Sequence, residues 1–240
     1  MSSGAGSGSG VSVSVSVSTP KYEVKDSSVY EPSEDTFLLI DAISLDAHTH
    51  YHNYHQHGDG HEGFVVSVEI GCGSGLPIVH LTMLLNALNT THHHTYTKKR
   101  GVVSLATDIN PAAAATARHT ASLNGVELEV IETDLVAGLE ERLGHSVDFL
   151  LFNPPYVITP TEEITSSLAA RAWAGGRDGR EVTDRFLPLV PFLLSPRGCC
   201  YLLLLEQNHP HQVMEYMQHH YSLSSQVSSP PKELRRRKED

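Results

Sequence analysis

The chain has 240 residues, with 28 Asp and Glu against 17 Lys and Arg, so its formal net charge is −11. This length suits one domain with a substantial core plus tails or inserts. The acidic charge disfavours a nucleic-acid-binding protein with a broad phosphate-contacting face. No run of apolar residues approaches the roughly 18 that a membrane span needs, which disfavours a membrane protein.

Cysteine content and the start of the chain indicate a compartment. Cys72, Cys199 and Cys200 are the only cysteines, and two of them are adjacent, which rarely suits a disulfide. The first residues lack the basic start and apolar core of a signal peptide. We therefore expect a reducing compartment, the cytosol or the nucleus.

Composition divides the chain into a central domain and two tails. Residues 1–20 are Ser- and Gly-rich and then alternate Val with Ser, and this low complexity predicts a disordered tail rather than a strand. Residues 222–240 are polar and end in a basic run, which we expect to be a solvated tail. The domain predicted between them, residues 21–221, contains two His-rich stretches at about 46–63 and 89–100. We expect both to be inserts; the irregular His spacing of the first favours a solvated segment over a metal site.

The periodic segments of this domain alternate between helix and strand. Ser33 is a candidate N-cap, followed by acids and an amphipathic helix from Phe37 to Ile43. Apolar runs then predict strands, and the segments between them predict helices. The strands are Phe64–Ile70, Val102–Ala106, Glu127–Ile131, Val147–Phe152 and Cys199–Leu205; the helices are Leu76–Leu88, Ala112–Asn124, Val182–Leu194 and His211–His219. Such alternation predicts an α/β fold, with a mostly parallel sheet covered by helices on both faces.

Acidic and glycine residues follow the first three strands. The first strand runs into Gly71-Cys72-Gly73-Ser74-Gly75, where Gly71 and Gly73 allow the backbone to approach a ligand closely. Asp108 ends the second strand, where it can accept both hydrogen bonds of a ribose diol. Asp134 follows the third strand, where it can accept from an adenine amino group. Because a GK[ST] phosphate-binding sequence is missing, an adenosine ligand without a pyrophosphate clamp, S-adenosylmethionine, is favoured.

The fourth strand ends at Asn153-Pro154-Pro155-Tyr156. Two prolines cannot donate ladder hydrogen bonds, so the strand must stop there. Ligands of open α/β sheets bind outside the carboxyl ends of the strands. The Asn153 side-chain oxygen and the Pro154 carbonyl can each accept one N–H of a planar NH₂ group, and Tyr156 can wall the pocket. This geometry suits a side-chain amide and equally suits adenine.

These motifs resemble those of a known family. EIGCGSG, TDINP, TDL and NPPYV resemble the class I S-adenosylmethionine-dependent methyltransferases of the amino-methylating NPPY group, which have a Rossmann-like fold. YEPSEDTFLLIDA, AWAGGRDGREVTDRFLPLV and LLSPRG narrow the resemblance to the HemK-like release-factor glutamine methyltransferases of eukaryotes and archaea. The resemblance covers most of residues 29–210 outside the two His-rich stretches.

The resemblance implies a substrate, a partner and site residues. The substrate is the glutamine of the GGQ loop in the class I translation termination factor. The partner is a small zinc-binding activator protein, with which family members form a heterodimer. The implied cofactor contacts are Thr36, Glu69, Gly71, Asp108, Asp134, Leu135 and Asn153, and the implied substrate amide pocket is Asn153, Pro154, Pro155, Tyr156 and Val157. No metal is implied in the site.

Two features concern the edges of the predicted sheet. Family members close the sheet with a C-terminal hairpin, whereas residues 222–240 show no apolar alternation, so this hairpin is expected to be incomplete. The strand Glu127–Ile131 is expected at the other edge, where an apolar edge invites strand addition by the activator. Alternative functions are methylation of adenine N6 in DNA or of a protein lysine, and a non-catalytic scaffold with this fold.

Overall fold

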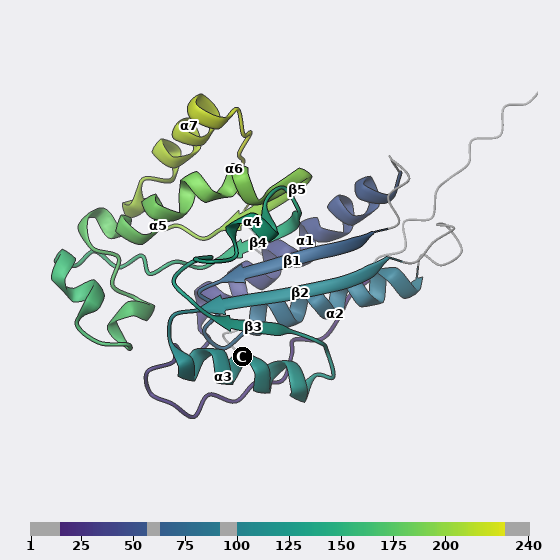
Figure 1. The fold of residues 1–240 in the computed structure, drawn as a ribbon, viewed down its shortest axis with the longest axis horizontal. Coiled ribbons are helices and arrows are strands. Elements are labelled where there is room, and N and C mark those ends of the chain that lie inside the picture. The colour runs from purple at the N-terminus through teal and green to yellow at the C-terminus, as the bar shows by residue number, and fades with distance from the viewer. Residues whose placement is uncertain (1–14, 57–62, 92–99, 229–240) are drawn as a thin grey trace, which may run out of the picture.

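The computed structural model describes residues 15–56, 63–91 and 100–228, and side chains within them except those of residues 53–56. Its centre is a five-stranded sheet in the order β3-β2-β1-β4-β5, with every neighbouring pair parallel (Figure 1). The strands are β1 (Phe64–Ile70), β2 (Gly101–Asp108), β3 (Glu129–Glu132), β4 (Val147–Phe152) and β5 (Leu194–Leu202). The predicted α/β fold with a parallel sheet is confirmed.

Helices cover both faces of the sheet, because the central strands are apolar on both sides. On β4, Phe149 and Leu151 point into one core cluster, while Leu150 and Phe152 point into the other. The first cluster is covered by α1 (Glu34–Gln56), α2 (Leu76–Thr91) and α3 (Pro111–Leu123). The second is covered by α5 (Glu181–Phe186), η5 (Leu187–Leu189), α6 (Val190–Leu193) and α7 (Pro210–Tyr221). Short elements complete the chain: α4 (Glu140–Leu143), η2 (Thr161–Thr165), η3 (Ala170–Ala172), η4 (Arg177–Gly179) and η6 (Glu206–Asn208).

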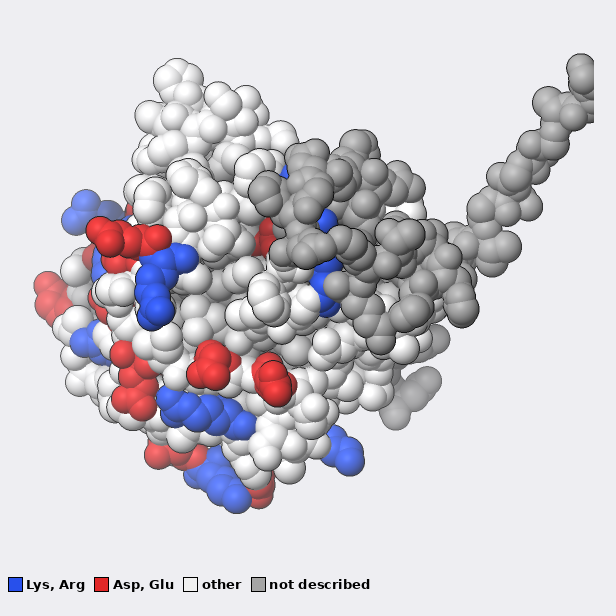
Figure 2. All heavy atoms as spheres, turned by 45° about the vertical axis from the view of Figure 1, so that its right-hand side comes forward, with Lys and Arg blue, Asp and Glu red and all other residues white. Residues whose placement is uncertain are grey.

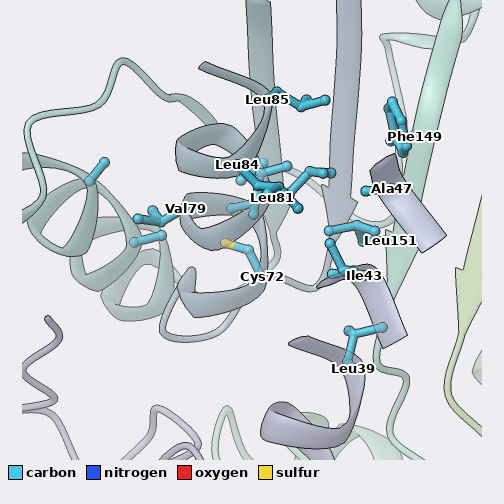
Figure 3. Packing of buried hydrophobic residues seen from close by; sticks show 14 of the residues in the cluster. Leu39, Ile43, Ala47, Cys72, Val79, Leu81, Leu84, Leu85, Phe149 and Leu151 are labelled. Carbon is cyan, nitrogen blue, oxygen red and sulfur yellow. The ribbon is translucent and has the colours of Figure 1, made fainter. Parts of the chain in front are cut away.

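The first core cluster explains why α1 is longer than predicted. Ile43, Ala47 and Tyr51 recur every four residues, are all almost fully buried, and so form one face of a continuous helix. Figure 3 shows Ile43 and Ala47 of this face meeting the β4 side chains, with leucines of α2 alongside. The prediction of a solvated insert beginning at residue 46 is therefore wrong for residues 46–52. Residues 57–62 lie outside the described part of the chain.

The first residues of the second His-rich stretch, predicted as part of an insert, belong to helix α2 instead. α2 continues through Thr91, and the Asn89 side chain donates to the Arg100 carbonyl at 2.7 Å. Asn89 thus ties the end of α2 to the start of β2. The remainder of the predicted insert, residues 92–99, lies outside the described residues.

Prolines divide the helix that was predicted over Val182–Leu194. The structure has α5, then the 3₁₀ turn η5, then α6 over this segment. Pro188 and Pro191 each lack a backbone N–H, so an uninterrupted α-helix cannot form across them. The segment still packs its apolar side chains on the second core cluster, which explains why its periodicity suggested one helix.

The two sheet edges and the tails also differ from their predicted bounds. β5 begins at Leu194, five residues before its prediction, and β3 begins two residues after its own. In the described residues up to 228, no strand follows β5; residues 229–240, on which the prediction about the C-terminal hairpin also rests, lie outside the described part of the chain. At the other end, Val15 and Val17 of the predicted N-terminal tail pack against the first core cluster.

The described helices include none that is long and apolar enough to cross a membrane. Within the same residues, no three His, Cys, Asp or Glu side chains are grouped so as to hold a metal ion. On the face shown in Figure 2, basic and acidic side chains are interspersed.

Candidate active site

The turn that connects β1 to α2 lies at the carboxyl edge of the sheet. Gly73 donates its backbone N–H to the Asp108 carboxylate at 2.9 Å, which ties this turn to the end of β2. Glu69, the penultimate residue of β1, accepts from the Ile78 backbone N–H in the first turn of α2 at 3.1 Å. Asp108 therefore fixes the glycine-rich turn, and Glu69 fixes the start of the helix that follows it.

Burial raises the pKa of both acids. Glu69 is almost fully buried, and its desolvation, opposed by the Ile78 N–H and assisted by the nearby Asp108, raises its pKa well above the ordinary value. Desolvation also raises the pKa of Asp108, although the backbone N–H groups of Asn110, Gly73 and Ile109 oppose it. Hydrogen bonds donated by further groups, such as ribose hydroxyls, would stabilise the ionised form of these buried carboxyl groups.

The turn after β3 brings Asp134 and Leu135 to the same edge. Asp134 accepts from the Arg185 guanidinium of α5 at 2.6 Å, and both side chains are about half exposed. Leu135 has a φ of 53°, which is uncommon for a residue with a branched side chain and indicates a sharply turned backbone. The ion pair places α5 over the turn that was predicted to bind adenine.

The loop after β4 is organised by an acid from α1. The Asn153 side-chain amide donates from Nδ2 to Asp35 Oδ2 at 3.0 Å, and the Tyr156 hydroxyl donates to the same oxygen at 3.0 Å. Asn153 Oδ1 is buried and has no hydrogen-bond partner in the protein. One end of the Asn153 amide is therefore anchored, and the other is available to a ligand.

A second segment holds this loop from outside. Val157 pairs with residues 173–175, donating to the Trp173 carbonyl at 2.9 Å and accepting from the Gly175 N–H at 2.8 Å. The buried Asn208 side chain donates to the Tyr156 carbonyl at 2.9 Å. Gly179 approaches so closely that a Cβ there would lie 2.0 Å from the Tyr156 carbonyl oxygen. The AWAGGRDG sequence is thus the clamp of the Asn-Pro-Pro-Tyr loop.

One cavity of about 210 Å³ joins these parts at the carboxyl edge of the sheet. Every predicted site residue lines it, including Thr36, Pro154 and Pro155, so the structure brings the whole predicted set together. Sequence reasoning missed Asp35, Trp173 and Arg185, which also line the cavity. Asp35 lies next to the predicted Thr36, but only its hydrogen bonds across 118 residues reveal a role in the site.

The cavity fits S-adenosylmethionine and an amino acceptor. Buried carboxyl groups line the end next to β1 and β2, and the unpaired Asn153 oxygen lies at the end next to β4. Burial and the adjacent Asp35 carboxylate raise the pKa of Tyr156, so its phenol stays protonated and acts as a donor, not as a base. The arrangement can therefore orient a neutral NH₂ group but offers no tyrosinate to deprotonate it.

Comparison with known proteins shows what the chain is similar to. Residues 63–179 match the family described as "Methyltransferase small domain". The chain is 43% identical over 191 residues to "Methyltransferase HEMK2" of Homo sapiens, covering 80% of this chain and 78% of the human one. It is 36% identical over 200 residues to "eRF1 methyltransferase catalytic subunit mtq2" of Schizosaccharomyces pombe, covering 79% and 78% of the two chains. A bacterial "Release factor glutamine methyltransferase" from Deinococcus radiodurans is 31% identical over 110 residues, covering 44% and 38%.

Proposed function

The chain belongs to the HEMK2 and Mtq2 family of S-adenosylmethionine-dependent methyltransferases, and on this premise we propose that it methylates a glutamine side-chain amide in a class I translation release factor. The proposed acceptor is N5 of the glutamine in the GGQ motif. The names of the fission yeast and bacterial relatives support a release factor as the substrate.

The observation that carries this proposal is the state of the Asn153 side chain. Its Nδ2 is held by Asp35, while its buried Oδ1 has no partner in the protein. A buried acceptor without a donor costs about 1–3 kcal/mol, so the site is stabilised by a ligand that brings an N–H group. A glutamine amide supplies two such groups on one nitrogen.

The chain's own residues then position the acceptor nitrogen. Asn153 Oδ1 accepts one N–H and the Pro154 carbonyl accepts the other, while the ring of Tyr156 packs on the flat amide. S-adenosylmethionine, held by Glu69, Asp108 and the neighbouring lining residues, supplies an electrophilic methyl group when bound. Two acceptors on the nitrogen also favour the positive charge that grows there in the transition state.

We further propose that a small zinc-binding activator protein docks on the β3 edge. β3 is the terminal strand of the sheet order, and Ile131 is partly exposed and belongs to neither core cluster. The edge of a terminal strand is a template for strand addition; on β3 the Val130 carbonyl accepts from the Arg118 guanidinium at 2.7 Å, a bond that an added strand would replace. The naming of the yeast relative as a catalytic subunit supports a partner of this kind.

Ile131→Lys is expected to weaken the complex with the activator by about tenfold or more, because a charge then lies on the docking strand. Co-purification from cells that express both proteins measures the effect. Leu205→Lys, which alters an exposed apolar side chain beyond the other sheet edge, is the control. Undiminished complex formation by Ile131→Lys, or a soluble and fully active chain without any activator, would contradict this docking site.

The proposed reaction is tested by incubating the purified complex with labelled S-adenosylmethionine and separate acceptors. The acceptors are wild-type release factor, the same factor with GGQ changed to GGA, and adenine-containing duplex DNA. We expect label on the wild-type factor alone. Label on the GGA factor would indicate another residue such as lysine, and label on DNA would indicate adenine N6. No label on any acceptor, with S-adenosylmethionine still bound, would indicate a scaffold.

A further inference from the structure

Asp35 is the hydrogen-bonding centre of the acceptor end of the site. Oδ2 accepts from Asn153 Nδ2 and from the Tyr156 hydroxyl, each at 3.0 Å. Oδ1 accepts from the Thr36 backbone N–H at 2.7 Å and from the Ser33 hydroxyl at 2.8 Å. Both carboxylate oxygens are thus used, and one carboxylate connects the first turn of α1 to the loop after β4.

The carboxylate form of Asp35 is maintained by these contacts. Burial alone would raise its pKa, but the hydrogen bonds donated by Asn153, Ser33, Thr36 and Tyr156 outweigh burial and lower it. Asp35 also lies in the first turn of a 23-residue helix, where the helix dipole favours a negative charge. At neutral pH the group is therefore ionised, and an ionised carboxylate can only accept hydrogen bonds.

An acceptor-only neighbour decides which end of the Asn153 amide faces the cavity. An asparagine side chain has a donating NH₂ and an accepting oxygen of nearly equal size, so shape alone does not select its orientation. Asp35 must receive the NH₂, which leaves Oδ1 facing the cavity, buried and without a protein partner. If the amide were turned over, two acceptors would face each other across 3.0 Å.

We propose that Asp35 is the positioning residue that fixes the hydrogen-bonding polarity of the acceptor site and so restricts it to groups that donate an N–H. Asp35 acts through Asn153, because protein donors already occupy both of its carboxylate oxygens. This inference rests on the proposed amide methylation, and it assigns acceptor selection to a residue of α1 rather than to the Asn-Pro-Pro-Tyr loop alone.

The decisive variant is Asp35→Asn, which keeps size and shape. The Thr36 N–H and Ser33 hydroxyl both need the one remaining oxygen of residue 35, so its new NH₂ turns toward Asn153. Asn153 must then rotate and present its own NH₂ to the cavity, where it repels the acceptor. We expect kcat on the release factor to fall about 100-fold, in the range found for loss of one well-placed hydrogen-bonding group. The affinity for S-adenosylmethionine should stay within about threefold.

A second variant tests polarity rather than structural damage. In the double variant Asp35→Asn with Asn153→Asp, the new NH₂ of residue 35 donates to the new carboxylate of residue 153. The other oxygen of residue 153 again faces the cavity as an acceptor. We expect the double variant to recover at least about tenfold in kcat over Asp35→Asn, whereas two structural lesions would simply add. Asn153→Asp alone places two carboxylates together and is expected to be inactive.

Glu34→Gln is the matched control, since Glu34 is an exposed acid in the same helical turn. Its kcat should stay within about twofold of wild type. Near-normal kcat in Asp35→Asn, a double variant no faster than Asp35→Asn, or a loss of cofactor affinity above tenfold in Asp35→Asn would each overturn the inference. Failure of the proposed function is a separate outcome, because wild-type protein would then leave the release factor unlabelled.

Discussion

Asn153→Ala is expected to lower kcat by at least about 100-fold while leaving the dissociation constant for S-adenosylmethionine within a few-fold. The substitution removes the buried oxygen that would accept an N–H of the substrate amide, and with it the group that Asp35 holds in place. Positioning of reacting atoms supplies much of the rate in reactions without a strong base. The end of the cavity next to Glu69 and Asp108 is left unchanged.

Single-turnover methylation of the release factor measures the first quantity, and calorimetric titration with S-adenosylmethionine measures the second. Asn86→Ala is the control, because Asn86 is an exposed asparagine on α2 outside the cavity. A variant of Asn153 that retains most of its turnover would refute the assignment. If the Asn153→Ala variant lost affinity for S-adenosylmethionine by the same factor as it lost kcat, Asn153 would be a residue of the cofactor site and not of the acceptor site.

The largest expected effect on stability comes from Gly75→Ala. Gly75 has a φ of 73°, and a Cβ there would lie 2.7 Å from the Ala117 Cβ and 2.8 Å from the Ala117 Cα on α3. The left-handed backbone costs about 1–2 kcal/mol for a residue with a Cβ. Overpacking against a helix backbone adds about 1–3 kcal/mol. We expect the free energy of unfolding to fall by about 2–5 kcal/mol.

Gly73→Ala is the internal control for this prediction. Gly73 has a φ of 51° in the same turn, but no atom lies within 4 Å of its would-be Cβ. It should therefore incur only the backbone cost of about 1–2 kcal/mol. Thermal unfolding of the full chains measures the difference, since 1 kcal/mol corresponds to roughly 2–4 °C at this size. Equal midpoints for the two variants would show that contact with α3 is not what requires Gly75.

Local sequence determined the strand that carries the chemistry and the positions of the site residues. Val147–Phe152 was predicted with the bounds that the structure gives, because an apolar run is followed by two prolines that end any strand. The predicted site residues converge because parallel strands bring their carboxyl ends to one edge, and alternation of helix and strand suffices to predict that arrangement.

The prediction was wrong where histidine-rich composition or apolar periodicity was given more weight than residue spacing or proline positions. The histidines after residue 46 hid the four-residue spacing of Ala47 and Tyr51, which are buried only because α2 and β4 lie against them. The division of the segment 181–193 into α5, η5 and α6 was readable from its prolines, yet apolar periodicity across them suggested one helix.

By itself the sequence determined the fold class, the bounds of β1 and β4, and the predicted residues that line the cavity, but not Asp35, Trp173 or Arg185. Only the tertiary structure decided how those residues are oriented. Asp35 reaches Asn153 across 118 positions, Arg185 reaches Asp134 across 51, and Asn208 reaches Tyr156 across 52. A side-chain hydrogen bond depends on distance and angle within a few tenths of an ångström, and residue spacing along the chain specifies neither once the chain has crossed the sheet.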